Sequence, residues 1–459
     1  MNAMTLLFPF YLMLLFGLVY FRSRLLFATW TLLYCLLPTY VYRFGSVSIY
    51  WCDLAAVAVL LYWYNDPVPR KSASLAIQWF KVLIATLVIG GLSSVVRYGA
   101  FFEPLYWILR YALALATLPI VTAYSRQPQL RSAMLAGVRL AAILMFVIAL
   151  GQEFRLPFNA TLDHILYDGY ASSRSDFGRS AVFASEGLVR VFGPYSTSTQ
   201  FGGAAVCVGV LLTMMSWTTK RPSILAGEQR YYTLATVMAW AAALMTISRH
   251  ALLAICVFLA VTAAADLRKS KWVWGLSASA MMLIGSGYLG DFNDFWIARL
   301  QKGGISTDTN LSDRLQTRPW ELYDRILHEP SVLWCGTGLG SEHVLSGVQY
   351  GFVSNGFLLY LFYCGFPAFL AFTGCFAYAF RRSLSQARDE LPAVVPAGVL
   401  AMAIIVAADN YAFLTTNLVF MWAAAIGLSF MPLGRSTQKP GGKGNPGRPS
   451  PIRFVQRIR

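Results

Sequence analysis

The sequence is divided into about thirteen long apolar runs separated by polar segments. The hydrocarbon core of a bilayer is about 30 Å thick and takes about 20 apolar residues per helix, so runs of this length predict membrane-spanning helices. The runs cover residues 4–20, 25–41, 48–64, 74–95, 105–123, 133–151, 200–218, 233–247, 251–266, 272–290, 355–380, 391–408 and 412–432. Of the 459 residues, 57% are apolar and 13% are charged, whereas about a quarter of the residues in soluble domains are charged. We therefore expect an all-α polytopic membrane protein with about thirteen transmembrane helices.

The same composition excludes several other classes of protein. It does not fit a soluble enzyme, a disordered protein or a fibrous protein. The 37 Lys and Arg residues behind the net charge of +16 lie between the apolar runs and form no single basic face, so we expect no nucleic-acid partner. Six of the seven cysteines fall inside apolar runs, which gives no disulfide framework. No basic residue precedes the first run, so we expect a retained helix and a chain that begins at Met1.

Lys and Arg residues are distributed unequally between alternate connecting segments. The short segments on one side contain only Arg43, Arg97 and Arg249. The segments on the other side contain Arg22, Arg24, Arg70, Lys71, Arg126, Arg131, Lys220, Arg221, Arg230, Arg268, Lys269, Lys271, Arg381, Arg382 and Arg388. The positive-inside rule makes this second set cytoplasmic and places the N-terminus outside.

This topology divides the chain into six regions. We expect N-terminal transmembrane helices in 1–151, a first long outer loop in 152–199, central transmembrane helices in 200–290, a large outer loop with an amphipathic helix in 291–354, C-terminal transmembrane helices in 355–433, and a disordered basic cytoplasmic tail in 434–459. The two outer loops carry eight Arg residues but a single Lys, Lys302. Because Arg recognises phosphate and carboxylate groups in a bidentate manner, this bias favours an anionic ligand.

Two short motifs lie where outer segments meet helices. In the segment 188–202, Gly193-Pro194 marks a turn and a Ser/Thr cluster can cap the next helix, whose free amides would attract an anion held by Arg190. The alternative is an ordinary helix cap with a solvated Arg. Around Arg249 there is almost no room for a loop, so we expect a tight helical hairpin with Arg249 at the outer interface beside His250. Snorkelling of Arg249 is the alternative there.

The large outer loop contains a Gly-x-Gly-x-Gly pattern from Gly336 to Gly340. A dinucleotide-binding fingerprint needs a strand and a βαβ context, which this segment lacks, so the pattern predicts a turn. Trp320 and Tyr323 stand at helical spacing and predict an amphipathic helix at the membrane interface, which carries two of the loop's Arg residues.

Together these features resemble the superfamily of O-antigen ligases and O-antigen polymerases (Wzy-type), which are bacterial envelope glycosyltransferases with a GT-C-like architecture. The matching elements are Arg190 to Gly193, Ser248-Arg249, an Arg…Trp…His-Glu-Pro…Gly-x-Gly-x-Gly order from Arg314 to Gly340, an Arg-x10-Gly spacing from Arg325 to Gly336, and the helix start Asn355 to Leu358. They span about the C-terminal two-thirds of the chain. The ligases have His where this chain has Ser354, so the resemblance favours the polymerase branch, although His343 could replace that His in a ligase.

The resemblance implies a polymerase that joins oligosaccharide repeat units, carried on undecaprenyl diphosphate, into a surface or secreted polysaccharide at the periplasmic face of the bacterial inner membrane. Its expected partners are the bilayer and the flippase and chain-length regulator (co-polymerase) of the same pathway. Guanidinium groups would stabilise the leaving diphosphate, and the scattered His residues give no metal-ligand spacing, so we expect neither metal nor cofactor. The candidate catalytic residues are Arg190, Arg249 and Arg314, with His343, Glu186 and Asp409 as possible general bases. The candidate substrate-binding residues are Arg318, Arg325, Tyr195, Ser354 and Asn355.

Four ionisable residues fall within the apolar runs: Asp53, Lys81, Arg110 and Arg139. Lys81 and Arg139 lie near cytoplasmic helix ends and can snorkel. Asp53 and Arg110 lie toward the outer ends of their helices, where they can form a pair. The competing class of function is a transporter or flippase for lipid-linked glycans, which would need polar residues through the membrane midplane, whereas here they concentrate outside.

Overall fold

The computed structural model describes most of the apolar runs and parts of the polar segments beside them. The described residues are 3–37, 41–44, 47–66, 73–99, 101–154, 156, 182–183, 188–189, 191, 195, 198–217, 226–246, 248–265, 328–339, 355–387, 393–408 and 416–431. The helices are α1 (Ala3–Tyr20), α2 (Leu25–Leu36), α3 (Trp51–Tyr64), α5 (Ser74–Tyr98), α6 (Phe102–Leu115), α7 (Thr117–Tyr124), α8 (Pro128–Glu153), α11 (Ser198–Trp217), α12 (Ala226–Met245), α13 (Arg249–Ala265), α18 (Ser331–Cys335), α20 (Gly356–Cys364), α21 (Phe366–Ala387), α22 (Val394–Ala408) and α24 (Thr416–Ser429). Two short antiparallel hairpins complete them, β1 (Val41–Phe44) with β2 (Val47–Tyr50) and β3 (Val182–Phe183) with β4 (Leu188–Val189).

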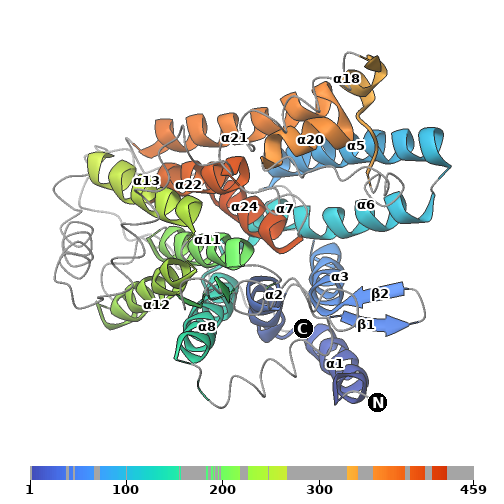
Figure 1. Ribbon diagram of the computed structural model, residues 1–459. Helices are drawn as coiled ribbons and strands as arrows, with labels where there is room; N and C mark the ends of the chain where they lie inside the picture. The colour runs from blue at the N-terminus through green and yellow to red at the C-terminus, as the bar shows by residue number, and fades with distance from the viewer. Residues whose placement is uncertain are drawn as a thin grey trace, which may run out of the picture.

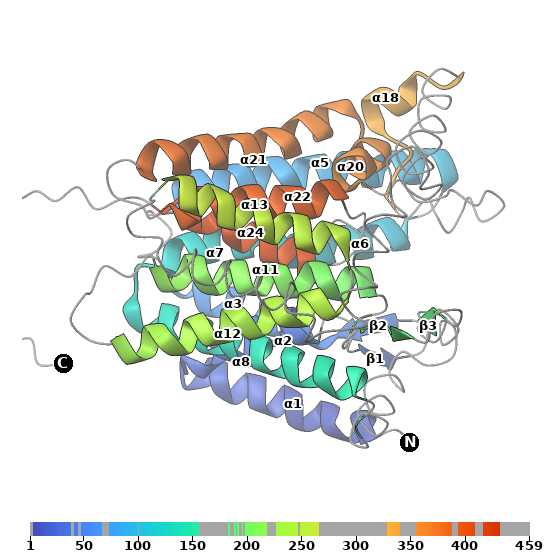
Figure 2. The same ribbon diagram turned by 60° about the vertical axis from the view of Figure 1, so that its left-hand side comes forward.

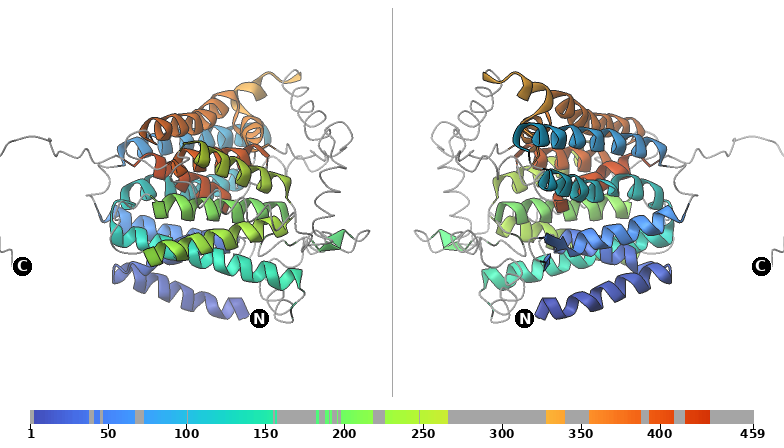
Figure 3. Two further views of the ribbon diagram at one scale, coloured as in Figure 1. Left: turned by 90° about the vertical axis from the view of Figure 1, so that its left-hand side faces the viewer. Right: turned by 90° about the vertical axis from the view of Figure 1, so that its right-hand side faces the viewer.

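The helices lie roughly alongside one another in a bundle (Figure 1). Figure 2 shows them stacked from α21 and α5 at one edge, through α22, α24 and α11, to α8 and α1 at the other. Helix α24 is the centre of the packing, since all of its residues are buried and it contacts α7, α11, α22 and α6. Both hairpins and α18 lie at the end of the bundle where the N-terminus is marked (Figures 2 and 3). Pieces of both long polar segments therefore share one end of the molecule.

The predicted helical class is confirmed, because twelve of the apolar runs coincide with described helices. The run 272–290 lies outside the described residues. Within the described part of the chain, three helices are long and apolar enough to cross a membrane, namely Ser74–Tyr98, Phe102–Tyr124 and Pro128–Glu153. The other apolar helical stretches whose side chains are described have 10–17 residues, among them Gln200–Ser216 within α11 and Tyr231–Met245 within α12. The expectation of about thirteen full-length spans is thus reduced to three candidate spans in these ranges.

Local chemistry explains why several helices are shorter than their apolar runs. The run 25–41 contains Pro38, and α2 ends at Leu36, before the proline that cannot continue it. The run 48–64 begins in β2, so its helix α3 starts only at Trp51. Gly365 has φ of +85° and separates α20 from α21 within a third run. Hydrophobicity alone did not indicate these breaks.

Close helix contacts depend on small residues and on Thr hydroxyls. A Cβ at Gly137 of α8 would lie 2.2 Å from the carbonyl oxygen of Ala28 in α2. In the same contact the Thr31 hydroxyl lies 3.1 Å from the Met134 carbonyl oxygen across the helix pair. The Thr122 hydroxyl donates to the carbonyl of Gly427, joining α7 to α24 at 2.8 Å. Backbone approach at glycine and hydroxyl bonds between helices are typical of packing in a bilayer, where the hydrophobic effect does not drive helices together.

Candidate functional site

The start of α11 packs against the turn between α12 and α13. A Cβ at Gly202 would lie 2.5 Å from the Thr246 hydroxyl and 3.2 Å from the Ser248 Cβ, so only glycine fits at this approach. Thr246 and Ser248 are both buried. We call this region the α11–α13 junction, defined by Gly202, Thr246 and Ser248. It brings the helix that follows the Arg190 segment next to the turn that precedes Arg249.

The predicted tight hairpin before Arg249 is confirmed, because three residues separate α12 from α13. Arg249 is the first residue of α13, and its side chain lies outside the described atoms. The neighbouring His250 ring is half-buried, and its Nδ1 lies 2.8 Å from the Ser248 hydroxyl. The ring is thereby held at the junction beside Arg249.

Tyr195 has a different role from the expected substrate contact. Its side chain is completely buried, and its hydroxyl donates a hydrogen bond to the carbonyl of Cys35 at the end of α2. Its ring packs near Phe201 in α11, with 5.6 Å between centroids. Because its side chain has no exposed surface, Tyr195 is not accessible to a sugar or a lipid in this structure. Its hydrogen bond instead attaches the segment before α11 to the end of α2.

Asn355 caps the start of α20. The Asn355 side-chain oxygen accepts hydrogen bonds from the backbone amides of Phe357 at 2.9 Å and Leu358 at 3.2 Å. These are amides of the first turn, which have no partner within the helix. The helix start that the sequence indicates at Asn355 to Leu358 is confirmed.

Residues 328–339 of the large polar segment are docked on the bundle, and we call them the docked segment. Its backbone amides at Thr337 and Gly338 donate to the carbonyls of Phe362 and Tyr363 in the last turn of α20, at 2.7 Å and 3.1 Å. Gly336 and Gly338 have φ of +71° and +104°, which is the region that favours glycine. The described part of the Gly-x-Gly-x-Gly pattern is therefore a turn that terminates α20.

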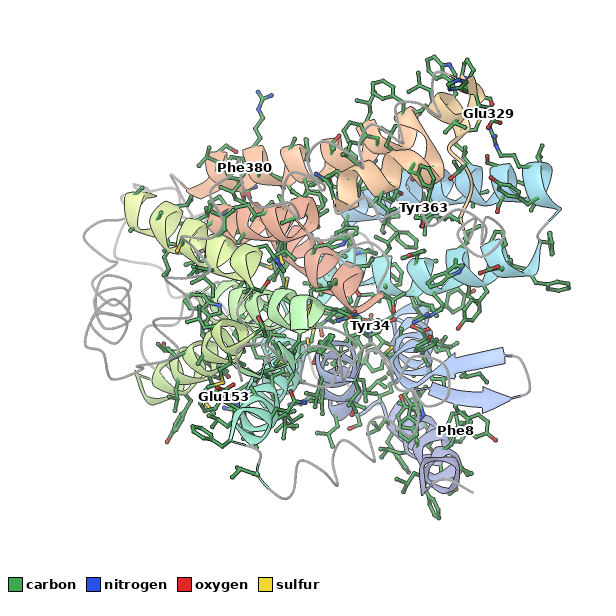
Figure 4. All side chains as sticks on the ribbon, viewed as in Figure 1. Phe8, Tyr34, Glu153, Glu329, Tyr363 and Phe380 are labelled. Atoms are coloured by element: carbon green, nitrogen blue, oxygen red, sulfur yellow. The ribbon has the colours of Figure 1, made fainter. Side chains whose placement is uncertain are left out.

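The docked segment is also attached through charge, by a pair that the sequence reasoning missed. The Arg97 guanidinium at the end of α5 bonds to the Glu329 carboxylate and, at 2.8 Å, to the Ser331 hydroxyl. Figure 4 shows Glu329 beside α18, above the end of α5. Arg97 was one of only three basic residues in the short outer segments, and that exception was the available indication of a partner.

The predicted pair between Asp53 and Arg110 is confirmed. Arg110 Nε lies 2.8 Å from Asp53 Oδ2, and both residues are buried. The Tyr34 hydroxyl donates to the other Asp53 oxygen at 3.1 Å, and Arg110 Nη2 donates to the Thr416 hydroxyl at 3.1 Å. The guanidinium carbon also lies 3.4 Å from the centroid of the Tyr50 ring. Four helices and β2 thus meet at one polar cluster, which Figure 4 locates by Tyr34 inside the bundle.

The remaining candidate residues lie outside the described residues. They are Glu186, Arg190, Arg314, Arg318, Arg325, His343, Ser354 and Asp409. Among the described residues there is no group of three or more His, Cys, Asp or Glu side chains that could hold a metal ion. The metal-independent chemistry inferred from the sequence stays a prediction.

Comparison with known proteins adds no relative. No protein-family profile and no curated protein matches this sequence. A function for the chain is therefore argued from its residues, from their arrangement, and from the resemblance described above.

Proposed function

We propose that the protein is a polymerase of the bacterial inner membrane that joins undecaprenyl-diphosphate-linked repeat units at the periplasmic face. Its finer architecture would be a GT-C-like bundle of transmembrane helices. The observation that carries the proposal is the α11–α13 junction. Because Gly202 contacts Thr246 and Ser248, the helix that follows the Arg190 segment begins beside the turn that precedes Arg249.

The reaction needs positive charge at such a place. A hydroxyl of one repeat unit attacks the anomeric carbon of the reducing-end sugar on the other, and the bond from that carbon to the diphosphate oxygen breaks. The hydroxyl proton passes to a general base, and the lipid diphosphate leaves with additional negative charge. Two guanidinium forks fixed before the reaction stabilise this charge in the transition state more than in the ground state. The helices α11 and α13 both begin at the junction, and the partial positive charge of their N-termini acts in the same direction.

Two other functions remain as alternatives for the same arrangement. A ligase would transfer a glycan block to a different acceptor, with His343 as a relocated base. A flippase would move the lipid-linked unit across the membrane without forming a bond. The concentration of Arg in the two long polar segments, and not along the apolar runs, favours an enzyme over a carrier.

The purified protein, given only lipid-linked repeat units, is expected to yield a ladder of longer lipid-linked chains. EDTA is expected to leave the ladder unchanged, because no step uses a metal. Transfer of one block to a second lipid acceptor, with no ladder from repeat units alone, would identify a ligase. Translocation of the repeat unit in vesicles without any ladder would identify a flippase.

Arg190→Lys and Arg249→Lys test individually whether each guanidinium group is needed for polymer formation. Each keeps the charge but removes the planar pair of donors, so we expect polymer yield to fall at least about tenfold at normal protein level. Arg381→Lys is the matched control, since Arg381 is exposed near the end of α21 and far along the chain from the junction. Wild-type yield from both junction variants would show that these residues only anchor helices.

A further inference from the structure

One face of α5 receives the docked segment through its backbone. The Leu339 amide donates to the Gly90 carbonyl at 3.1 Å, and the Ser93 hydroxyl donates to the Gly336 carbonyl at 3.0 Å. A Cβ at Gly338 would lie 2.6 Å from the Ser94 backbone nitrogen and Cα. The chain therefore crosses α5 in direct backbone contact, and any side chain at position 338 would separate the two.

The opposite side of the same crossing contacts α20. A Cβ at Gly336 would lie 2.3 Å from the carbonyl carbon and oxygen of Tyr363. At that contact the amides of the docked segment satisfy the last carbonyls of α20, as described above, and Figure 4 shows Tyr363 on α20 beneath this segment. The segment is thus enclosed between two helices that are far apart in the sequence, and glycine is required on both sides.

The ion pair between Arg97 and Glu329 provides a second point of attachment at the other end of the docked segment. The Glu329 side chain is 52% exposed, and pairs in such positions change an equilibrium by less than about fivefold. The pair can therefore orient the segment but cannot hold it alone. The glycine crossing carries the attachment.

We propose that Gly336 and Gly338 are positioning residues for the polymerisation reaction, and that Arg97 and Glu329 assist them. This inference rests on the proposed function. The docked segment belongs to the polar segment that contains three of the candidate arginines, Arg314, Arg318 and Arg325. Arg325 lies three residues before His328, so the chain allows it to move no more than about 11 Å from that fixed point. The Arg-x10-Gly spacing then has a physical meaning, since its glycine lies in the crossing that anchors the chain shortly after its arginine.

Loss of the crossing should reduce turnover more than it reduces substrate binding. A displacement of about 1 Å in a positioned group can cost about a hundredfold in rate. We expect Gly336→Ala and Gly338→Ala to lower kcat by at least about tenfold, with KM for the lipid-linked repeat unit changed less than about threefold. Gly374→Ala is the matched control, because its added Cβ would come no closer than 3.8 Å to Trp79. It should keep wild-type kcat and KM.

Docking itself can be measured without activity. In full-length protein with Cys256→Ser and Cys335→Ser, the pair Arg97→Cys and Glu329→Cys should be joined within one chain by a bis-maleimide cross-linker, whose spacer replaces the length of the two side chains that meet in the ion pair. We expect Gly338→Ala to lower the yield of this cross-link several-fold, and Gly374→Ala to leave it unchanged. Should the alanine variants not accumulate, the charge reversals Arg97→Glu and Glu329→Arg replace them. Each is expected to lower kcat about two- to fivefold, and their combination is expected to restore it.

The outcomes separate this inference from the proposed function. Loss of the cross-link together with loss of kcat supports the positioning role. Loss of the cross-link with wild-type kcat overturns it, while the wild-type ladder upholds the polymerase. An unchanged cross-link in Gly338→Ala overturns the docking argument. Absence of any ladder from wild-type protein overturns the proposed function, and the positioning role with it.

Discussion

At the scale of single residues, the pair of Asp53 and Arg110 is the clearest case of charge held inside the described bundle. Both partners are hydrogen-bonded beyond the pair, through Tyr34 and Thr416. Such a pair is costly to break, because the remaining charge is left buried without a partner, whereas replacing both by apolar residues of similar size can be nearly neutral.

Asp53→Leu and Arg110→Met should therefore each lower the free energy of unfolding by about 3–5 kcal/mol, and the double variant should lower it by less than either. Thermal unfolding of the purified variants in detergent measures all three values. Strictly additive losses would contradict a coupled pair and indicate two independent packing sites.

The candidate residues differ in how far the sequence could predict their roles. Asp53 and Arg110 stood out because an ionisable side chain in an apolar run needs a partner. Tyr195 gave no comparable indication, since a Tyr in a polar segment is equally compatible with a ligand contact and with burial. Its burial depends on the Cys35 carbonyl, which is distant in the sequence and joins it only in the folded chain.

At the scale of elements, the contact between α2 and α8 depends on the absence of a side chain at Gly137. An added Cβ would lie 2.2 Å from the Ala28 carbonyl oxygen and from the Thr31 hydroxyl, so the helices would have to move apart. We expect Gly137→Ala to destabilise the protein by about 1–3 kcal/mol.

Gly17→Ala is the matched comparison, because no atom lies within 4 Å of the Cβ that it would add in α1. It should be neutral or slightly stabilising, as Ala is the better helix former. Unfolding temperatures of the two variants in the same detergent give the comparison. Equal unfolding temperatures would mean that the α2–α8 contact accommodates the added methyl group with little loss of stability.

The positions of the helices were largely predictable, and their ends were not. Twelve apolar runs indicated where fourteen of the described helices lie, because hydrophobicity is a local property of the chain. The breaks at Gly365 and the hairpin before Trp51 depend on other parts of the molecule. A Cβ at Gly365, for example, would lie 2.3 Å from the Trp334 carbonyl oxygen. This contact joins two segments that are separate in the sequence, so the local hydrophobic pattern does not predict it.

At the scale of the whole molecule, the distribution of Lys and Arg predicts which end of the bundle faces the cytoplasm. Reporter fusions after Ser175 and Thr307 should be active outside, and fusions after Gln386 and at the C-terminus should be active inside. Figure 2 shows β3 and α18, which belong to the two long polar segments, at the same end of the bundle. The fusions after Ser175 and Thr307 should therefore report the same side of the membrane. Opposite locations for the first two fusions would contradict the topology.

The contacts between α5 and the docked segment can form only late in the synthesis of the chain, because the two lie far apart in the sequence. Ser93 and Gly336 are 243 positions apart in the sequence. At ribosomal rates of about 5–20 residues per second, Gly336 is therefore synthesised roughly 12–50 s after Ser93. During that interval the Gly90 carbonyl and the Ser93 hydroxyl lack the groups that later bond them. Helix α5 therefore acquires these two bonds only after more than two-thirds of the chain has been synthesised.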